Sequence, residues 1–357
     1  MPFILIFCAY LIANVYMIRY ARKALPSDQR KTKTILTVLF ALCALAIFPE
    51  FLFKKYISET GIMQSLHFIG CSWLVFTLYM TIGLLLFDIL KLFRIKIKHS
   101  FWITLAVVSG LLGYGYWNYR NPKIKNIELN TNGKLNKEIT IAAVSDIHLG
   151  YGTGKEQMKE YVQLINSQNP DIIIIGGDLI DNDIRPVRLN KMQEELNSLK
   201  APSGVFMAPG NHDYFNGIEN TRKFLSETQV VLLEDSVAVI EDLGIQIAGR
   251  KDKRQKDRLP LNQLMQGTDG EKPVILIDHQ PYDLQETADN NVYLQFSGHT
   301  HRGQIWPLNC LTDNLFEVSH GYVKKGESNI YVSSGLSLWG PPFRIGTESE
   351  VVVFRLK

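Results

Sequence analysis

The sequence predicts an α/β sandwich of two β-sheets flanked by helices, preceded by a region of four membrane-spanning helices. Long apolar runs fill the chain up to about Tyr119, whereas strand-like and helix-like segments alternate from Pro122 onward. The early part of this alternation reads as strand, helix, strand, and the late part is mostly strand, as in layered α/β domains. We therefore expect a transmembrane region over residues 1–119 and a second domain over residues 122–357.

Composition excludes several classes of protein. Of the 357 residues, 46% are hydrophobic and 20% are charged, which does not fit a disordered or low-complexity chain. The net charge of +3 is small, so no nucleic-acid partner is indicated, and nothing points to an obligate protein partner. Three of the four cysteines lie inside apolar runs and no CxxC pair occurs, so we expect neither a disulfide framework nor a cysteine zinc site.

Four apolar runs approach the roughly 20 residues that a helix needs to cross a bilayer. They cover about residues 3–18, 35–53, 66–87 and 101–117. The first run has no basic start and no small-residue cleavage site, so we expect it to remain as a span and not to be removed as a signal peptide.

The distribution of basic residues predicts the orientation of these spans, because lysine and arginine close to a span resist translocation. The segments after the first and third runs are strongly basic: Arg19, Arg22, Lys23, Arg30, Lys31 and Lys33, then Lys91, Arg94, Lys96 and Lys98. Both segments would lie in the cytoplasm. We therefore expect a multi-pass protein of the inner, cytoplasmic membrane, with everything after Trp117 on its outer face.

Continuous apolar runs in the second domain suit strands that are covered on both faces. Strands are predicted at residues 139–144, 171–176, 205–208, 245–248, 274–277, 293–296, 330–332 and 351–355. Helices are predicted at residues 155–168, 187–199 and 218–227.

Polar clusters follow several of these strands, at the position where α/β folds place ligands. Each cluster alone is weak, because DxH and GDxxD arise by chance and a single histidine is more often structural than a ligand. Together their carboxylate, carboxamide and imidazole groups suit two borderline divalent cations. The residues are Asp146, His148, Asp178, Asp181, Asn211, His212, Asp213, His279, His299 and His301.

The ordered series DxH, GDxxD, GNHD, His and GHTH resembles the calcineurin-like metallophosphoesterases, over about 235 residues. The resemblance implies two divalent metal ions (manganese, iron or zinc) and a hydroxide between them that attacks phosphorus. It implies that Asp178 bridges both ions. The other ligands would be Asp146, His148 and His301 at one ion, and Asn211, His279 and His299 at the other.

The same resemblance gives His212 a catalytic role as the general acid for the leaving oxygen or as a charge stabiliser, with Asp181 holding its imidazole. Near the C-terminus, Gly303-Gln-Ile-Trp-Pro and the stretch from Ser334 to Arg344 are similar to a bacterial membrane-associated branch of the family. That branch includes phosphodiesterases and enzymes that cleave the pyrophosphate of lipid-linked sugar nucleotides. Arg302 and Arg344 would either contact a substrate phosphate or form exposed salt bridges.

We therefore expect a membrane-anchored enzyme that hydrolyses a phosphodiester or pyrophosphate bond of a lipid-linked or envelope substrate. Asn182 stands where the Ser/Thr protein phosphatases of the family carry arginine, which disfavours a protein phosphatase. The alternatives are a phosphomonoesterase or nucleotide pyrophosphatase acting on soluble substrates, and a non-catalytic membrane scaffold. A scaffold would be free to lose ligands, and here every ligand position is filled.

Overall fold

The computed structural model describes residues 2–49, 60–135 and 137–357. The chain divides into two compact units. One unit runs to Trp117 and includes the short segment Gly340–Phe343, and the other comprises Asn118–Trp339 and Arg344–Lys357.

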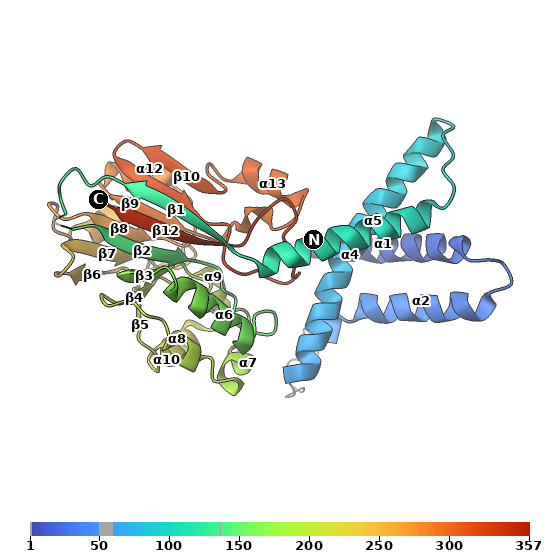
Figure 1. Ribbon diagram of the computed structural model, residues 1–357, viewed down its shortest axis with the longest axis horizontal. Coiled ribbons are helices and arrows are strands. Elements are labelled where there is room, and N and C mark those ends of the chain that lie inside the picture. Colours follow the sequence, from blue (N-terminus) through green and yellow to red (C-terminus); the bar gives the residue numbers. More distant parts are fainter. Residues whose placement is uncertain (1, 50–59, 136) are drawn as a thin grey trace. The chain divides into compact units, whose positions relative to one another are not determined.

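The N-terminal unit is helical (Figure 1). Its described helices are α1 (Pro2–Ala24), α2 (Arg30–Leu45), α4 (Thr60–Leu92) and the greater part of α5 (Ser100–Arg120). Within the described residues, one helix is long and apolar enough to cross a membrane, over Gly61–Leu92. The structure thus supports one of the four expected spans by length and composition. Residues 50–53 of the expected second span lie outside the described residues.

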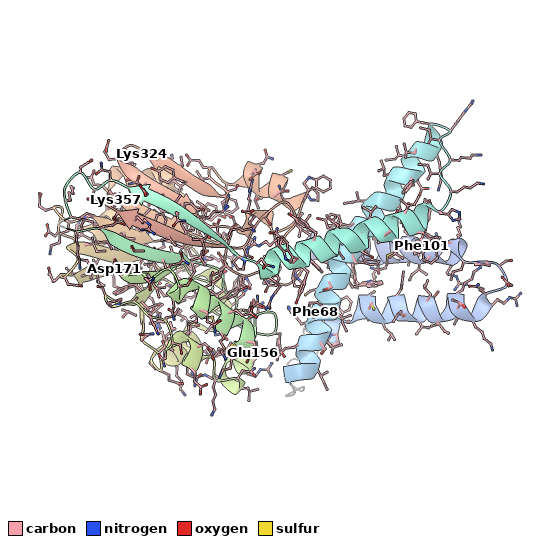
Figure 2. The ribbon with its side chains drawn as sticks, in the orientation of Figure 1. Phe68, Phe101, Glu156, Asp171, Lys324 and Lys357 are labelled. Atoms are coloured by element: carbon pink, nitrogen blue, oxygen red, sulfur yellow. The ribbon has the colours of Figure 1, made fainter. Side chains whose placement is uncertain are left out.

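The side chains of this helical unit are distributed in an unusual way for a protein in water. Leu5, Ile12, Ile35 and Leu42 are each more than 60% exposed, and Phe68, labelled on α4 in Figure 2, is 48% exposed. Apolar side chains therefore cover much of the outer surface.

Several polar side chains of the helical unit, by contrast, are paired, and one of them, Asn14, is buried. The buried Asn14 accepts a hydrogen bond from Trp73 Nε1 at 2.8 Å and donates to the Tyr10 carbonyl at 2.9 Å. Asp88, toward the end of α4, accepts hydrogen bonds from the hydroxyls of Tyr16 and Tyr20. In a low-dielectric surrounding such groups are stable only when paired, and these are paired.

The second unit contains two six-stranded mixed sheets. The first has the strand order β1-β12-β2-β3-β4-β5, and the second has the order β10-β11-β9-β8-β7-β6. The strands of the first sheet are β1 (Lys123–Leu129), β12 (Glu350–Leu356), β2 (Ile139–Val144), β3 (Ile172–Ile175), β4 (Val205–Met207) and β5 (Val230–Leu232). Those of the second are β10 (Gly321–Lys325), β11 (Ser328–Val332), β9 (Leu294–Ser297), β8 (Val274–Ile277), β7 (Ile245–Gly249) and β6 (Ser236–Ile240).

The alternation of side chains along each strand produces four layers. In β2, Ile139, Ile141 and Ala143 point into the core between the sheets, whereas Ala142 and Val144 point to the opposite face. On that opposite face α6 (Lys155–Asn166) and α10 (Ile218–Leu225) cover the first sheet (Figure 1). On the far face of the second sheet, α11 (Leu261–Met265) packs against β8. The expected sandwich of two sheets flanked by helices is confirmed.

Shorter helices complete this unit. They are α7 (Ile184–Leu189), α8 (Gln193–Leu196), α9 (Asn211–Phe215), α12 (Leu284–Asp289) and α13 (Leu308–Leu315), with a 3₁₀ turn, η1, at His301–Gly303. The helix predicted at residues 187–199 is two short helices, because Lys191, with a positive φ, interrupts it between α7 and α8.

Parallel pairing sets which ends of the strands meet. Strands β2, β3, β4 and β5 run parallel in the first sheet, and β7, β8, β9 and β11 do so in the second. Asp171, labelled in Figure 2, lies just before β3 and accepts a hydrogen bond from Thr140 N at 2.8 Å, so it closes the N-terminal end of the sheet. The polar clusters all follow the C-terminal ends.

Candidate metal centre

Five strand ends supply the candidate ligands. Asp146 and His148 follow β2, Asp178 follows β3, and Asn211 opens α9 after β4. From the second sheet, His279 follows β8, and His299 and His301 follow β9. The structure therefore brings together, within one short region, residues that are up to 155 positions apart in the sequence.

The backbone at these positions is strained. Five of the seven candidates have a positive φ, between 46° and 71°: Asp146, His148, Asp178, His299 and His301. A non-glycine residue in the left-handed region costs roughly 1–2 kcal/mol. Such strain persists only where the surrounding structure imposes it, and it is concentrated at functional sites.

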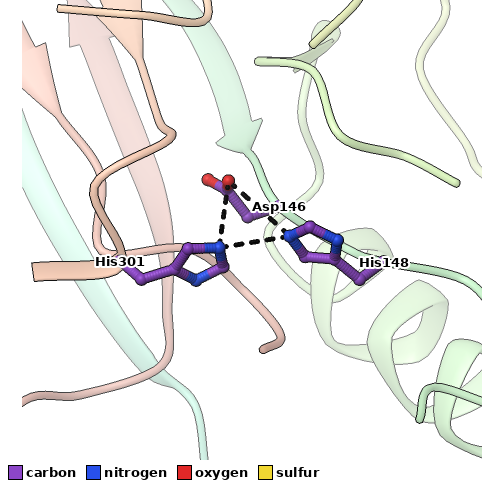
Figure 3. A group of neighbouring side chains, drawn as sticks. All are labelled: Asp146, His148 and His301. Carbon is purple, nitrogen blue, oxygen red and sulfur yellow. Dashed lines mark hydrogen bonds and ion pairs between the residues drawn. The ribbon is translucent and has the colours of Figure 1, made fainter. Parts of the chain in front are cut away.

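Asp146, His148 and His301 form the first group (Figure 3). The Nε2 atoms of His148 and His301 are 3.1 Å apart, and Asp146 Oδ1 lies 3.9 Å from the former and 3.4 Å from the latter. Ligand atoms about 2.1 Å from one ion are about 3.0–3.4 Å apart in octahedral or tetrahedral geometry. These three atoms thus fit one transition-metal ion, and only the 3.9 Å distance between Asp146 Oδ1 and His148 Nε2 is longer than this range.

Asp178, His279 and His299 form the second group. His279 Nδ1 lies 2.7 Å from the Gly176 carbonyl, which fixes the tautomer with its proton on Nδ1 and leaves Nε2 as a lone-pair donor. That Nε2 lies 3.2 Å from Asp178 Oδ2. Within the described part of the chain, the buried Oδ1 of Asn211 has no hydrogen-bond partner, as a metal ligand would not.

Asp178 faces both groups through one oxygen. Its Oδ2 lies 3.2 Å from His279 Nε2 and 3.9 Å from His148 Nε2, while its Oδ1 accepts a hydrogen bond from His212 N at 2.7 Å. A carboxylate in this position can serve two ions.

The electrostatics of the site also fit cations. Burial lowers the pKa of His279, but the adjacent Asp178 carboxylate outweighs it and raises that pKa to about 10. The Asp178 carboxylate thus favours a protonated His279 at the position where a metal ion would stand. Metal binding releases such a proton. The residues present fit a pair of divalent ions.

A histidine and a carboxylate lie beside both groups. His212 Nδ1 is 2.9 Å from Asp181 Oδ1, and the two rings of His148 and His212 lie 4.7 Å apart between centroids. Burial opposes ionisation of Asp181, yet the imidazoles of His148 and His212 lower the pKa of its carboxyl below the usual range. An ionised Asp181 can therefore orient the His212 ring.

Comparison with known proteins identifies the family. The family model described as calcineurin-like phosphoesterase matches residues 139–303. A metallophosphoesterase of Helicobacter pylori strain J99 is 32% identical over 313 residues, covering 85% of this chain and 80% of that protein. This chain belongs to the calcineurin-like metallophosphoesterases. It is a metal-dependent phosphoesterase.

Other relatives share the likeness. A metallophosphoesterase of Campylobacter jejuni is 30% identical and covers 97% of this chain and 95% of that protein. A transmembrane protein with metallophosphoesterase domain from Danio rerio is 30% identical, over 71% of this chain and 62% of that one. Among solved structures, a 5′-nucleotidase precursor of Thermus thermophilus matches with a TM-score of 0.37 and 14% identity, over 61% of this chain and 55% of that chain.

Asp213 has a role in the phosphoesterase that we did not predict. It is fully buried, and its two carboxylate oxygens accept hydrogen bonds from Ile180 N at 3.1 Å and Gly210 N at 2.9 Å. Burial and the charge of Asp178 raise its pKa to about 6. Asp213 therefore ties the loop after β3 to the loop after β4, and its place in the GNHD motif was the available signal.

The expectation that Arg344 contacts substrate needs correction. Its side chain is fully buried and donates to backbone carbonyls: His301 at 2.9 Å, Gly335 at 3.1 Å, Ser337 at 2.9 Å, and also Ser334. Burial lowers its pKa to about 10, so the guanidinium stays charged at neutral pH. Arg344 is neither a phosphate ligand nor an exposed salt bridge. It positions the turn that carries His301.

Arg302 lies on η1, half-buried, with a φ of 48°. Its backbone N–H donates to Thr300 Oγ1 at 3.1 Å, and its guanidinium forms no hydrogen bond or ion pair with any described residue. A contact with substrate phosphate therefore remains a proposal for Arg302.

Replacing Asp178 by Asn should lower the metal content from two ions per chain to less than about one, because the shared carboxylate is lost from both groups. Metal analysis of the purified full-length protein measures this directly. The exposed Asp289→Asn is the matched control and should retain two ions. Retention of both ions by Asp178→Asn would contradict the bridging role.

Replacing Arg344 by Met should lower the melting temperature by about 6–12 °C, since a loss of about 3 kcal/mol at about 2–4 °C per kcal/mol is expected when its carbonyl partners lose their donor. Thermal unfolding followed by intrinsic fluorescence measures the shift. Arg355→Met, which removes an exposed ion pair with Glu138, should cost less than about 1 kcal/mol. Equal shifts in melting temperature for the two variants would contradict a structural role of Arg344.

Proposed function

We propose that this phosphoesterase hydrolyses a phosphodiester or pyrophosphate bond of a lipid-linked substrate at a membrane surface. The convergence of Asp146, His148, Asp178, Asn211, His279, His299 and His301 carries the hydrolytic part of this proposal. When bound, a pair of divalent ions supplies a positive centre for the phosphate and lowers the pKa of an attacking water. Side chains of the protein carry out the remaining steps of the hydrolysis.

His212 protonates the leaving oxygen. Its ring is held by Asp181 through Nδ1, which leaves Nε2 as the atom that carries the proton. Its backbone N–H is bonded to Asp178 Oδ1, so ring position and ligand position are fixed together. In the imidazolium form of His212, Nδ1–H faces Asp181 and Nε2–H is the proton that passes to the leaving oxygen.

The lipid part of the proposal is supported by α13. This helix packs on η1, where the backbone of Leu308 and Asn309 lies against Gly303. Leu308, Leu311 and Leu315 are 45%, 56% and 65% exposed, so its apolar face points outward. Each leucine left in water forgoes roughly 1.5–3 kcal/mol of burial. We infer that this face contacts the acyl chains of a substrate or bilayer beside His301.

We further propose a multi-pass anchor formed by α1, α2, α4 and α5, with the catalytic unit on the outer face of the inner membrane. Its support is the apolar outer surface of these helices and the basic residues between α1 and α2 and between α4 and α5. Labelling of the exposed Cys310 by an impermeant maleimide in sealed right-side-out vesicles checks the orientation. Labelling only after permeabilisation would place the catalytic unit on the cytoplasmic side of the membrane instead.

Replacing His212 by Ala should lower kcat by about 10²–10⁴-fold for an alkyl leaving group, because general acid catalysis is then lost. The loss should be smaller for 4-nitrophenolate, which leaves without a proton. A series of aryl and alkyl diesters measures the dependence of kcat on leaving-group pKa. An equal loss for all members would assign His212 to charge stabilisation instead.

Replacing Leu308, Leu311 and Leu315 together by Gln should reduce kcat/KM for a diphosphate lipid in vesicles about tenfold more than for a soluble aryl diester, through lost apolar contact. Asn314→Gln, on the same helix, is the control. A triple variant with equal losses on both substrates would favour an enzyme of soluble substrates with the helices as an anchor alone.

A further inference from the structure

The segment after β7 is rich in basic residues, and most of them are paired. Salt bridges join Arg250 and Arg258 to Asp278, Lys251 to Asp257 and Lys253 to Asp283, at N–O distances of 3.2, 2.6, 2.7 and 2.7 Å. Asp278 directly precedes the ligand candidate His279, so two of these pairs fasten the segment to the end of β8. These ion pairs therefore hold the segment next to the candidate metal centre.

Arg254 differs from its neighbours. It is exposed, and no described carboxylate forms an ion pair with it. Its guanidinium carbon lies 5.2 Å from the centroid of the Phe215 ring, in a cation–π contact. Phe215 is itself 54% exposed at the end of α9. An unpaired arginine resting on an exposed aromatic ring keeps its donors available for an anion.

Phe215, the ring that Arg254 contacts, lies beside His212. The centroid of the Phe215 ring is 5.3 Å from that of the His212 ring. The centroid of the exposed Trp339 ring lies 6.0 Å from that of the same His212 ring. Phe215 therefore connects Arg254 to the side of the candidate metal centre on which His212 lies.

The backbone around Arg254 is held in place. Arg254 N donates to Asp252 Oδ1 at 2.9 Å, and Asp252 is 2% exposed. Lys253 N donates to Gln280 Oε1 at 3.2 Å, next to His279, and its ammonium lies 4.3 Å from the centroid of the Tyr282 ring. The arginine is therefore positioned before substrate arrives, which lowers the entropic cost of binding an anion.

We propose that Arg254, supported by Phe215, is a specificity-determining residue that binds a second anionic group on the leaving-group side of the substrate. This inference rests on the proposed function, in which His212 marks the leaving-group side. An arginine binds phosphate bidentately, so the favoured second group is a phosphate, as in a diphosphate diester. The planar rings of Phe215 and Trp339 both lie beside the His212 ring and suit a leaving group that also has an apolar or planar part.

The test compares Arg254→Gln with Lys256→Gln, an exposed lysine of the same segment whose loss changes the net charge equally. Substrates are ADP-ribose, a diphosphate diester, and bis(4-nitrophenyl) phosphate, which has no second anion. Arg254→Gln should lower kcat/KM for the former about tenfold more than for the latter, chiefly through KM. Lys256→Gln should change both equally.

Binding provides a readout that does not depend on turnover. Calorimetry should show that Arg254→Gln weakens methylenediphosphonate about tenfold more than methylphosphonate, with Phe215→Leu intermediate. Equal weakening of both ligands, or the same pattern in Lys256→Gln, would overturn the assignment of Arg254. A wild-type enzyme that fails to hydrolyse the aryl diester would instead overturn the hydrolytic function, a separate outcome.

Discussion

Buried carboxylates are the constraint on which the rest of the catalytic unit depends. Asp146, Asp178, Asp181 and Asp213 are 0%, 2%, 8% and 0% exposed and lie within one cluster of loops. Removing a single carboxylate from water costs several kcal/mol unless opposite charge and donors compensate. Backbone N–H groups supply part of that compensation, as His299 N does for Asp146 at 3.1 Å. Imidazoles and bound cations must supply the remainder, so the fold has to deliver both to this one place.

That requirement explains the strained backbone and the glycines around the site. A Cβ on Gly298 would lie 2.2 Å from Asp146 Oδ2, and one on Gly210 would lie 2.2 Å from Asp178 Oδ1. The segment from Ser333 to Ser337 is then fixed from two sides. Arg344 bonds its carbonyls, while the buried Glu350 accepts from Ser333 Oγ and Ser334 N, both at 3.0 Å. Because Ser337 N donates to the Asp146 carbonyl, this frame reaches a candidate metal ligand.

The sequence predicted the central strands well and the outer ones poorly. β2 and β8 have the predicted bounds, since a strand covered on both faces is a continuous apolar run. β1 and β10, at the edges of their sheets, have few buried positions and alternate with charged residues, so no such run marks them. The ligand candidates were visible because each follows a strand. The role of Arg344 was not, because its partners are backbone carbonyls, and backbone groups leave no trace in a sequence.

The two units follow opposite rules for apolar side chains. In the catalytic unit the core between the sheets is closed, with Ile141, Ile174 and Phe296 fully buried. In the helical unit leucines and isoleucines point outward while Asn14 is inside. Helix α13 belongs to the catalytic unit, yet its leucines are exposed while Asn309 and Thr312 are partly buried. The exposed leucines of α13 lie beside the turn that carries His301, so the lipid contact proposed above would remove their apolar surface from water.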